Sequence, residues 1–275
     1  MKTPTHILTF RPLVRYVDKK QAVIDAHFMF HPIDHPTTAG KKRHAKYRHP
    51  ICLDAQIPSL EVVLRMVGPQ GKIYDYRASI DPSQPESMIR FDIPQPKRWW
   101  PSTLGKQSLY QLTAVLIQKD NLIDTWQASL GLTSVRAQTA NWIKQGLLLV
   151  NGKKFCIHEV YPFTKSVSNE ILPFTADMLV HIKKHFAPDN LYHAADKAGV
   201  LLLQSVAVNQ KSAQGKMLSP KSRQQITQQI DRLSSHPSIV GWHIPSKFKN
   251  AEQIAKLIHQ LDPVRRIFKH LPRVC

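Results

Sequence analysis

The sequence is poor in cysteine, in acidic residues and in long apolar runs. Its three cysteines, Cys52, Cys156 and Cys275, are too few and too widely spaced for a disulfide framework or a zinc cluster. The longest apolar stretch, residues 199–208, is far shorter than the ~20 residues of a membrane helix. Residues 1–6 lack the apolar core of a signal peptide. We therefore expect a cytoplasmic protein in a reducing environment, without a membrane span.

Acidic residues are outnumbered two to one, with 19 Asp and Glu against 38 Lys and Arg, so the net charge is +19. An excess of this size first suggests nucleic-acid binding, but both halves of the chain are basic. The dense basic run contains Lys41, Lys42, Arg43, Lys46 and Arg48. It lacks an apolar period, which favours a solvated loop. The alternative is a site for an anionic partner such as nucleic acid, an acidic glycan or a lipid headgroup.

The first half of the sequence contains short runs in which apolar and polar side chains alternate. This alternation puts every second side chain on one face, as in a half-buried strand. The runs cover residues 22–30, 60–67, 73–80, 110–116 and 122–132. Gly68-Pro69-Gln70-Gly71 predicts a hairpin turn between two of them. Together with proline-rich connections, the pattern predicts a β-sandwich.

In the second half the apolar period lengthens and strand and helix patterns alternate, which predicts parallel β/α units. The first expected element is a helix capped by Thr175 that carries Met178, Leu179, Ile182 and Phe186. A helix near Leu191 that ends at Gly199 and a buried strand at 200–208 follow. The last three are a helix that begins at Ser219-Pro220, a strand at 239–244, and a helix capped by Asn250 that ends at Asp262-Pro263.

Residues 236–247 read His-Pro-Ser-Ile-Val-Gly-Trp-His-Ile-Pro-Ser-Lys. The segment resembles the fourth barrel strand of the family 2 glycoside hydrolases, the family of β-galactosidases, β-glucuronidases and β-mannosidases. That pattern runs from HPSI through Trp to an Asn-Glu pair, whose Glu is the general acid/base. Here Ser246 stands at the Asn position and Lys247 at the Glu position, so the motif is present without its catalytic acid.

Other segments resemble the same family in the same order. They lie at residues 98–101 (RWWP) with 104–105 and 108–110, at 131–136, at 149–155 (LVNGKKF), at 191–201 and at 261–265. The resemblance implies an immunoglobulin-like β-sandwich over residues 1–140 and an incomplete TIM-type (β/α) barrel over residues 141–275. It also implies that Trp99 and Trp100 are structural, whereas exposed aromatic rings of this kind could instead stack on a sugar.

The resemblance also predicts that the catalytic machinery is incomplete. Retaining glycosidases need two carboxyl groups roughly 5 Å apart. An ammonium at Lys247 would instead repel a cationic transition state by roughly 4 kcal/mol at a separation of about 4 Å. The 28 residues after Lys247 (248–275) are fewer than the roughly 30 of one β-α-β unit, so we expect no nucleophile strand here. The remaining acids, Glu252 and Asp262, are expected to be solvent-facing or capping groups.

We therefore expect a family 2-like protein without catalytic residues that acts in carbohydrate-related binding or as a scaffold. A vestigial pocket of Trp242, His243, Ser246 and Lys247 would suit an acidic sugar. The alternatives are a residual or partner-completed O-glycosyl hydrolase and a basic polyanion or nucleic-acid binder. A second copy or another chain would complete the barrel. No cofactor and no metal are expected, because histidines such as His31 and His35 lack a third ligand at a suitable spacing.

Overall fold

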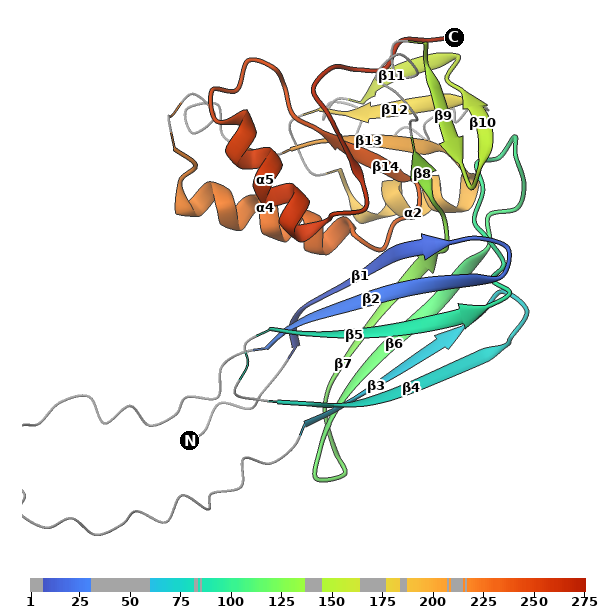
Figure 1. Ribbon diagram of the computed structural model, residues 1–275, viewed down its shortest axis with the longest axis vertical. Coiled ribbons are helices and arrows are strands. Elements are labelled where there is room, and N and C mark those ends of the chain that lie inside the picture. The colour runs from blue at the N-terminus through green and yellow to red at the C-terminus, as the bar shows by residue number, and fades with distance from the viewer. Residues whose placement is uncertain are drawn as a thin grey trace, which may run out of the picture.

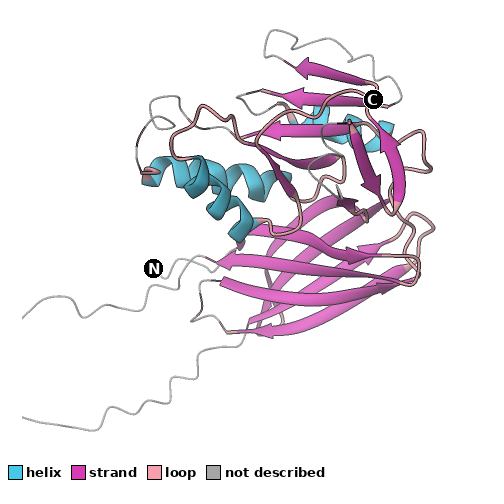
Figure 2. Cartoon of the chain, turned by 45° about the horizontal axis from the view of Figure 1, so that its top comes forward, coloured by secondary structure: helices cyan, strands magenta, loops and turns pink. Residues whose placement is uncertain are grey.

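The computed structural model describes residues 7–30, 60–81, 84, 86–136, 145–163, 177–183, 187–206, 208, 215 and 217–275. The first part is all-β and consists of two packed sheets, and a parallel sheet with helices lies beside it (Figures 1 and 2). The basic run from Lys41 to Arg48 and the expected domain boundary at residue 140 lie outside the described residues. None of the described helices is long and apolar enough to cross a membrane.

The all-β part consists of two antiparallel sheets that face each other (Figure 1). One sheet has the order β1-β2-β5, with β1 at Ile7–Val17, β2 at Gln21–Phe30 and β5 at Glu86–Pro94. The other has the order β4-β3-β6-β7, with β3 at Leu60–Val67, β4 at Ile73–Ile80, β6 at Leu109–Gln118 and β7 at Asn121–Gly131. The predicted β-sandwich is confirmed.

The sandwich core forms where the alternating pattern placed it. Ala22, Ile24 and Ala26 on β2 are fully buried, and Leu112 and Leu116 on β6 are buried against them in one cluster. The predicted turn between β3 and β4 is also present, because the backbone N–H of Gly71 donates to the carbonyl of Gly68 over 2.9 Å. Alternation alone was sufficient here because each strand has one face in the core and one face outside.

The second part contains a five-stranded sheet in the order β11-β12-β13-β14-β15, in which each neighbouring pair is parallel. Its strands are β11 (Glu159–Phe163), β12 (Met178–Ile182), β13 (Leu201–Ser205), β14 (Ile239–His243) and β15 (Arg266–Phe268). Helices α2 (Asp189–Ala198), α4 (Pro220–Leu233) and α5 (Ala251–Leu261) connect β12 through to β15 in turn. The predicted β/α alternation is confirmed for these three connections.

Helix boundaries follow local chemistry. The Ser219 side chain accepts a hydrogen bond from the backbone N–H of Ser222, and Pro220 opens α4 where its missing N–H costs nothing. Gly199 ends α2 with φ of 73°, a left-handed conformation that glycine adopts readily. Asn250 precedes α5 as predicted, but its side chain makes no capping hydrogen bond.

The helix expected around Met178 is wrong, because Met178–Ile182 is strand β12. All five of its residues are buried, since helices cover one face of the sheet and other side chains cover the opposite face. A strand buried on both faces is continuously apolar, so its pattern cannot be distinguished from that of a short buried helix. The proposed cap Thr175 and the last predicted helix position, Phe186, lie outside the described residues.

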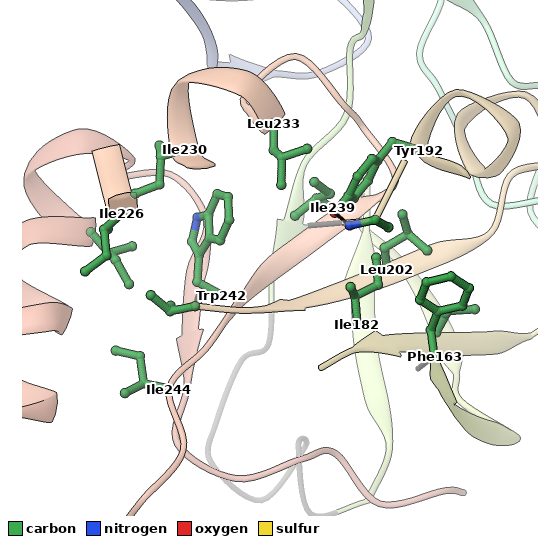
Figure 3. Close-up of a cluster of buried hydrophobic side chains, with 14 of the residues drawn as sticks. Phe163, Ile182, Tyr192, Leu202, Ile226, Ile230, Leu233, Ile239, Trp242 and Ile244 are labelled. Carbon is green, nitrogen blue, oxygen red and sulfur yellow. Dashed lines mark hydrogen bonds between the residues drawn. The ribbon is translucent and has the colours of Figure 1, made fainter. Parts of the chain in front are cut away.

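The two faces of the parallel sheet are buried in different ways. Figure 3 shows one face, where Ile226, Ile230 and Leu233 of α4 pack toward Trp242 and Ile239 of β14. The other face is covered near its amino end by a small sheet of order β10-β9-β8. Its strands are β8 (Val135–Arg136), β9 (Leu147–Val150) and β10 (Lys153–Cys156). The two faces therefore belong to separate apolar clusters.

The sandwich meets the β/α part through close contacts. A Cβ added at Gly131, the last residue of β7, would lie 2.3 Å from Cγ of Pro237, so glycine is needed for this approach. The Arg11 side chain of β1 forms a buried ion pair with Asp231 of α4. Burial raises the pKa of Asp231, against the opposing effect of Arg11. Two motif segments, around Gly131 and around Pro237, thus contact each other at this junction.

Cys156 and Cys275 form a disulfide with their Cα atoms 5.9 Å apart and a sequence separation of 119. The spacing of the cysteines in the sequence did not predict this pairing. Cys52 lies outside the described residues.

Candidate functional site

Polar side chains line up at the carboxyl ends of three neighbouring strands. His181 is the fourth residue of β12, and Ser205 and His243 end β13 and β14. Ser205 pairs with His243 in the strand register, and its side chain shares a face with that of Leu203, two residues earlier. Ligands of parallel β/α sheets bind at this edge. This row, His181–Ser205–His243, is therefore the candidate site.

The three side chains form one hydrogen-bonded row. Nε2 of His181 lies 2.9 Å from Oγ of Ser205, and the same oxygen lies 2.9 Å from Nδ1 of His243. The two imidazole rings are perpendicular, with centroids 4.9 Å apart. Nδ1 of His181 is buried without a partner among the described residues. Because a buried N–H without an acceptor is rare, we infer that Nε2 of His181 carries the proton and donates to Ser205, which donates to His243.

Burial lowers the pKa of both imidazoles. The pKa of His181 falls to about 4, chiefly through burial and secondarily through His243, and that of His243 falls to about 4 through burial. Both rings are therefore neutral at pH 7. A neutral imidazole with such a low pKa is neither an effective proton donor nor a strong base at that pH.

The row also lacks the features of a serine nucleophile site. Ser205 is within reach of a histidine, but it is only 2% exposed and the histidine is a weak base. In the described part of the chain no carboxylate is bonded to either imidazole of the row to orient it. The row is therefore not arranged for covalent catalysis by Ser205.

The structure separates the members of the predicted pocket. His243 belongs to the polar row, but Trp242 is fully buried on the opposite, helix-covered face, where Nε1 donates to Asp262 over 2.9 Å. This corrects the predicted grouping, since successive residues of a strand point to opposite faces. Ser246 and Lys247 are exposed in the turn that follows β14, beyond the same edge. His181 and Ser205 were missed, because no local motif marks them.

The two acids that follow Lys247, Asp262 and Glu252, lie in different surroundings. Asp262 is fully buried, and its carboxylate accepts hydrogen bonds from Trp242, from Arg265 and from backbone N–H groups. Burial raises its pKa, but the Arg265 charge and these hydrogen bonds outweigh that effect and lower the pKa overall. Glu252 is exposed in the first turn of α5. Both positions agree with the capping and solvent-facing roles expected from the sequence.

A second polar cluster lies at the opposite, amino end of the sheet. Nδ1 of His236 lies 2.6 Å from Oδ2 of Asp196, whose Oδ1 accepts from the backbone N–H of Ser238. The carbonyl of Asp196 accepts from Nε1 of Trp99 over 2.8 Å. Trp99 is fully buried, so it is structural, as the resemblance implied, and is not a sugar platform. The half-buried Trp100 carries the Arg98 guanidinium over its ring, 4.7 Å from the centroid.

The fold and the edge site define a class of protein in which a β-sandwich leads into a parallel β/α sheet with its polar groups at the carboxyl edge. Comparison with known proteins gives the family. The sequence profile of the glycosyl hydrolases family 2 matches residues 60–132. The chain is a relative of the family 2 glycoside hydrolases and corresponds to a part of their length.

Two curated relatives illustrate the match. The chain is 24% identical over 184 residues to an exo-beta-D-glucosaminidase of Streptomyces avermitilis, an alignment that covers 60% of this chain and 20% of that protein. It is 24% identical over 182 residues to a beta-mannosidase B of Aspergillus terreus, covering 60% and 22%. The chain thus spans about a fifth of the length of these relatives.

Solved structures support the fold over nearly the whole chain. A beta-glucuronidase of Parabacteroides merdae matches with a TM-score of 0.68 at 11% identity, covering 96% of this chain and 34% of that one. A beta-glycosidase of Bacteroides vulgatus matches with a TM-score of 0.66 at 17% identity, covering 97% and 34%. At these identities the structures establish the fold alone.

The polar row predicts how stability depends on pH. In the unfolded chain the two histidines titrate near pH 6.5, and in the folded protein near 4, so the unfolded state binds more protons between these values. The stability that the two neutral histidines contribute is complete above pH 6.5 and is lost as the pH falls toward 4. When the pH falls from 7 to 5, each histidine should lower the free energy of unfolding by about 2 kcal/mol. Urea unfolding at both pH values measures the loss.

The variant His243→Gln should reduce this pH dependence, whatever its stability at pH 7. His259→Gln provides the matched control, because His259 is exposed on α5 and should leave the slope unchanged. An identical pH dependence in the wild type and His243→Gln would contradict the assignment of buried neutral imidazoles.

Proposed function

We propose that this protein binds a carbohydrate or acts as a scaffold and does not hydrolyse glycosides. The observation that carries the proposal is the chemistry of the carboxyl edge. The residues that lie at the ends of β12, β13 and β14 and in the turn after β14 are His181, Ser205, His243, Ser246 and Lys247, none of which is a carboxylic acid. A retaining glycosidase needs a carboxyl acid/base at this edge.

Lys247 opposes glycoside hydrolysis at the position where the family has its glutamate. A lysine ammonium is a poor proton donor compared with a carboxylic acid, and it has no lone pair with which to act as a base. Its positive charge would also disfavour a cationic sugar transition state. The neighbouring imidazoles are neutral at pH 7, so they do not replace the missing acid.

The proposed architecture is a sandwich over residues 1–140 and an incomplete (β/α) barrel over residues 141–275. Its support is the parallel order β11 to β15, the one-helix connections, and the layering of one sheet face. On that face Leu179 pairs with Leu201 in an apolar cluster, and His181 and Ser205 lie farther toward the carboxyl ends of the same two strands. Barrel interiors are layered in this way, with polar functional groups at the top.

The ligand that this edge suits best is a sugar with a carboxylate. The Lys247 ammonium can pair with an anionic group, and His243 offers a neutral imidazole at the end of β14, just before the turn that carries Lys247. Hydrogen bonds from neutral groups orient a sugar hydroxyl without charge repulsion, while the ammonium supplies the preference for an acid. A uronic acid is therefore the proposed ligand class.

The purified protein should release no aryl product from chromogenic β-galactoside, β-glucuronide or β-mannoside above the uncatalysed rate. It should bind glucuronate in preference to glucose, as measured by isothermal titration calorimetry. Lys247→Met should weaken glucuronate binding about fivefold, because one exposed charge pair contributes up to about 1 kcal/mol.

Lys249→Met provides the matched control, since Lys249 is also exposed and lies two residues farther along. It should leave glucuronate affinity unchanged. Turnover of any aryl glycoside that disappears in Glu252→Gln would instead support the residual or partner-completed hydrolase. Binding of heparin but not of glucuronate would favour the polyanion binder.

We further propose that a second copy or another chain adds strands to the parallel sheet. Within the described residues, β11 and β15 each pair with one strand only, so each leaves one row of backbone groups without a strand partner. Such edges favour pairing with further strands. Size-exclusion chromatography with light scattering should show a dimer or larger assembly, and a monomer that persists on dilution and concentration would contradict it.

A further inference from the structure

Three side chains that bind metals in other proteins come together where α2 meets the start of β14. His193 and Asp196 lie one turn apart on α2, and His236 lies in the turn before β14. One possible ligand atom from each lies within 4.8 Å of the others. No local motif marks this group, because Asp196 and His236 are 40 positions apart in sequence.

The hydrogen bonds of this group leave one nitrogen of His236 available. Asp196 occupies Nδ1 of His236 at 2.6 Å, and its other oxygen accepts from the backbone N–H of Ser238 at 3.1 Å. The His236 ring is therefore held in place, and Nε2 is the nitrogen left for a second partner. The ring of His193 lies 5.1 Å from that of His236, centroid to centroid. Both imidazoles can thus contribute a nitrogen to one ion.

The burial of the two histidines differs in a way that suits a metal site. His236 is 4% exposed and Asp196 is 1% exposed, whereas His193 is exposed. Metal-binding histidines generally donate their other ring N–H to a carboxylate, which fixes the ring and raises its basicity. Asp196 already holds the His236 ring through such a hydrogen bond, and the exposed His193 keeps the group accessible from solvent.

We propose that His193 and His236 bind one transition-metal ion of the Zn²⁺ class, with Asp196 as the carboxylate that orients His236. Imidazole nitrogens favour Zn²⁺, Ni²⁺ and Cu²⁺ over Mg²⁺ and Ca²⁺, which prefer oxygen ligands. The site lies at the amino end of the parallel sheet, opposite the His181–Ser205–His243 row. It is therefore independent of the proposed sugar site, and its ion would join α2 to the turn before β14.

The test is Zn²⁺ binding to the full chain by isothermal titration calorimetry, with Mg²⁺ as the comparison ion. The chain has other histidines, so the readout is the difference between variants. His193→Ala should remove the tightest Zn²⁺ site or weaken it at least about tenfold, since it removes a direct ligand. His193→Gln, which keeps a similar size, should have the same effect. Zn²⁺ should raise the melting temperature of the wild type and not that of either variant.

His259→Ala is the matched control, because His259 is an exposed histidine on α5 and should leave Zn²⁺ affinity unchanged. Both His193 variants change an exposed side chain and keep the Asp196–His236 hydrogen bond, so they should fold, as circular dichroism can verify. Equal Zn²⁺ affinity and stoichiometry in the wild type and both His193 variants would overturn the proposal. So would a preference for Mg²⁺.

Discussion

The buried carboxylate of Asp196 holds together the segments on which the rest of the structure depends. The carboxylate accepts hydrogen bonds from Nδ1 of His236 and from the backbone N–H of Ser238. The backbone carbonyl of Asp196 accepts a hydrogen bond from Nε1 of Trp99. A carboxylate taken out of water is stable only when such partners replace its hydration. Asp196 therefore fixes helix α2, the turn before β14 and the end of the sandwich relative to one another.

This constraint explains why the first half of the HPSI-containing segment keeps its resemblance to the family. The first half of the HPSI-containing segment, from His236 to Ser238, bonds Asp196 and packs against Gly131 of the sandwich. Only the end of the segment, Ser246 and Lys247, lies at the carboxyl edge where chemistry would occur. The segment thus has one part that joins the sandwich to the β/α part and another part that lies at the carboxyl edge.

The sequence was sufficient where one local pattern decided the structure. Alternation located the sandwich core, and Ser219 and Gly199 set helix boundaries through local chemistry. It was insufficient at Met178–Ile182, where burial on both faces hides the strand period. The His181–Ser205–His243 row also escaped detection, because parallel pairing brings together residues far apart in sequence. Trp242 was assigned to the wrong face, although the period of two separates it from His243.

The most direct test of this account is a double-mutant cycle between Asp196 and His236, measured by urea unfolding at pH 7. Asp196→Asn and His236→Asn, singly and together, give the coupling free energy of the two side chains. If Asp196 fastens the junction, the coupling should be about 1.5–3 kcal/mol, as for a buried hydrogen bond to a charged group. Additive effects, with no coupling beyond about 0.5 kcal/mol, would contradict the central role of Asp196.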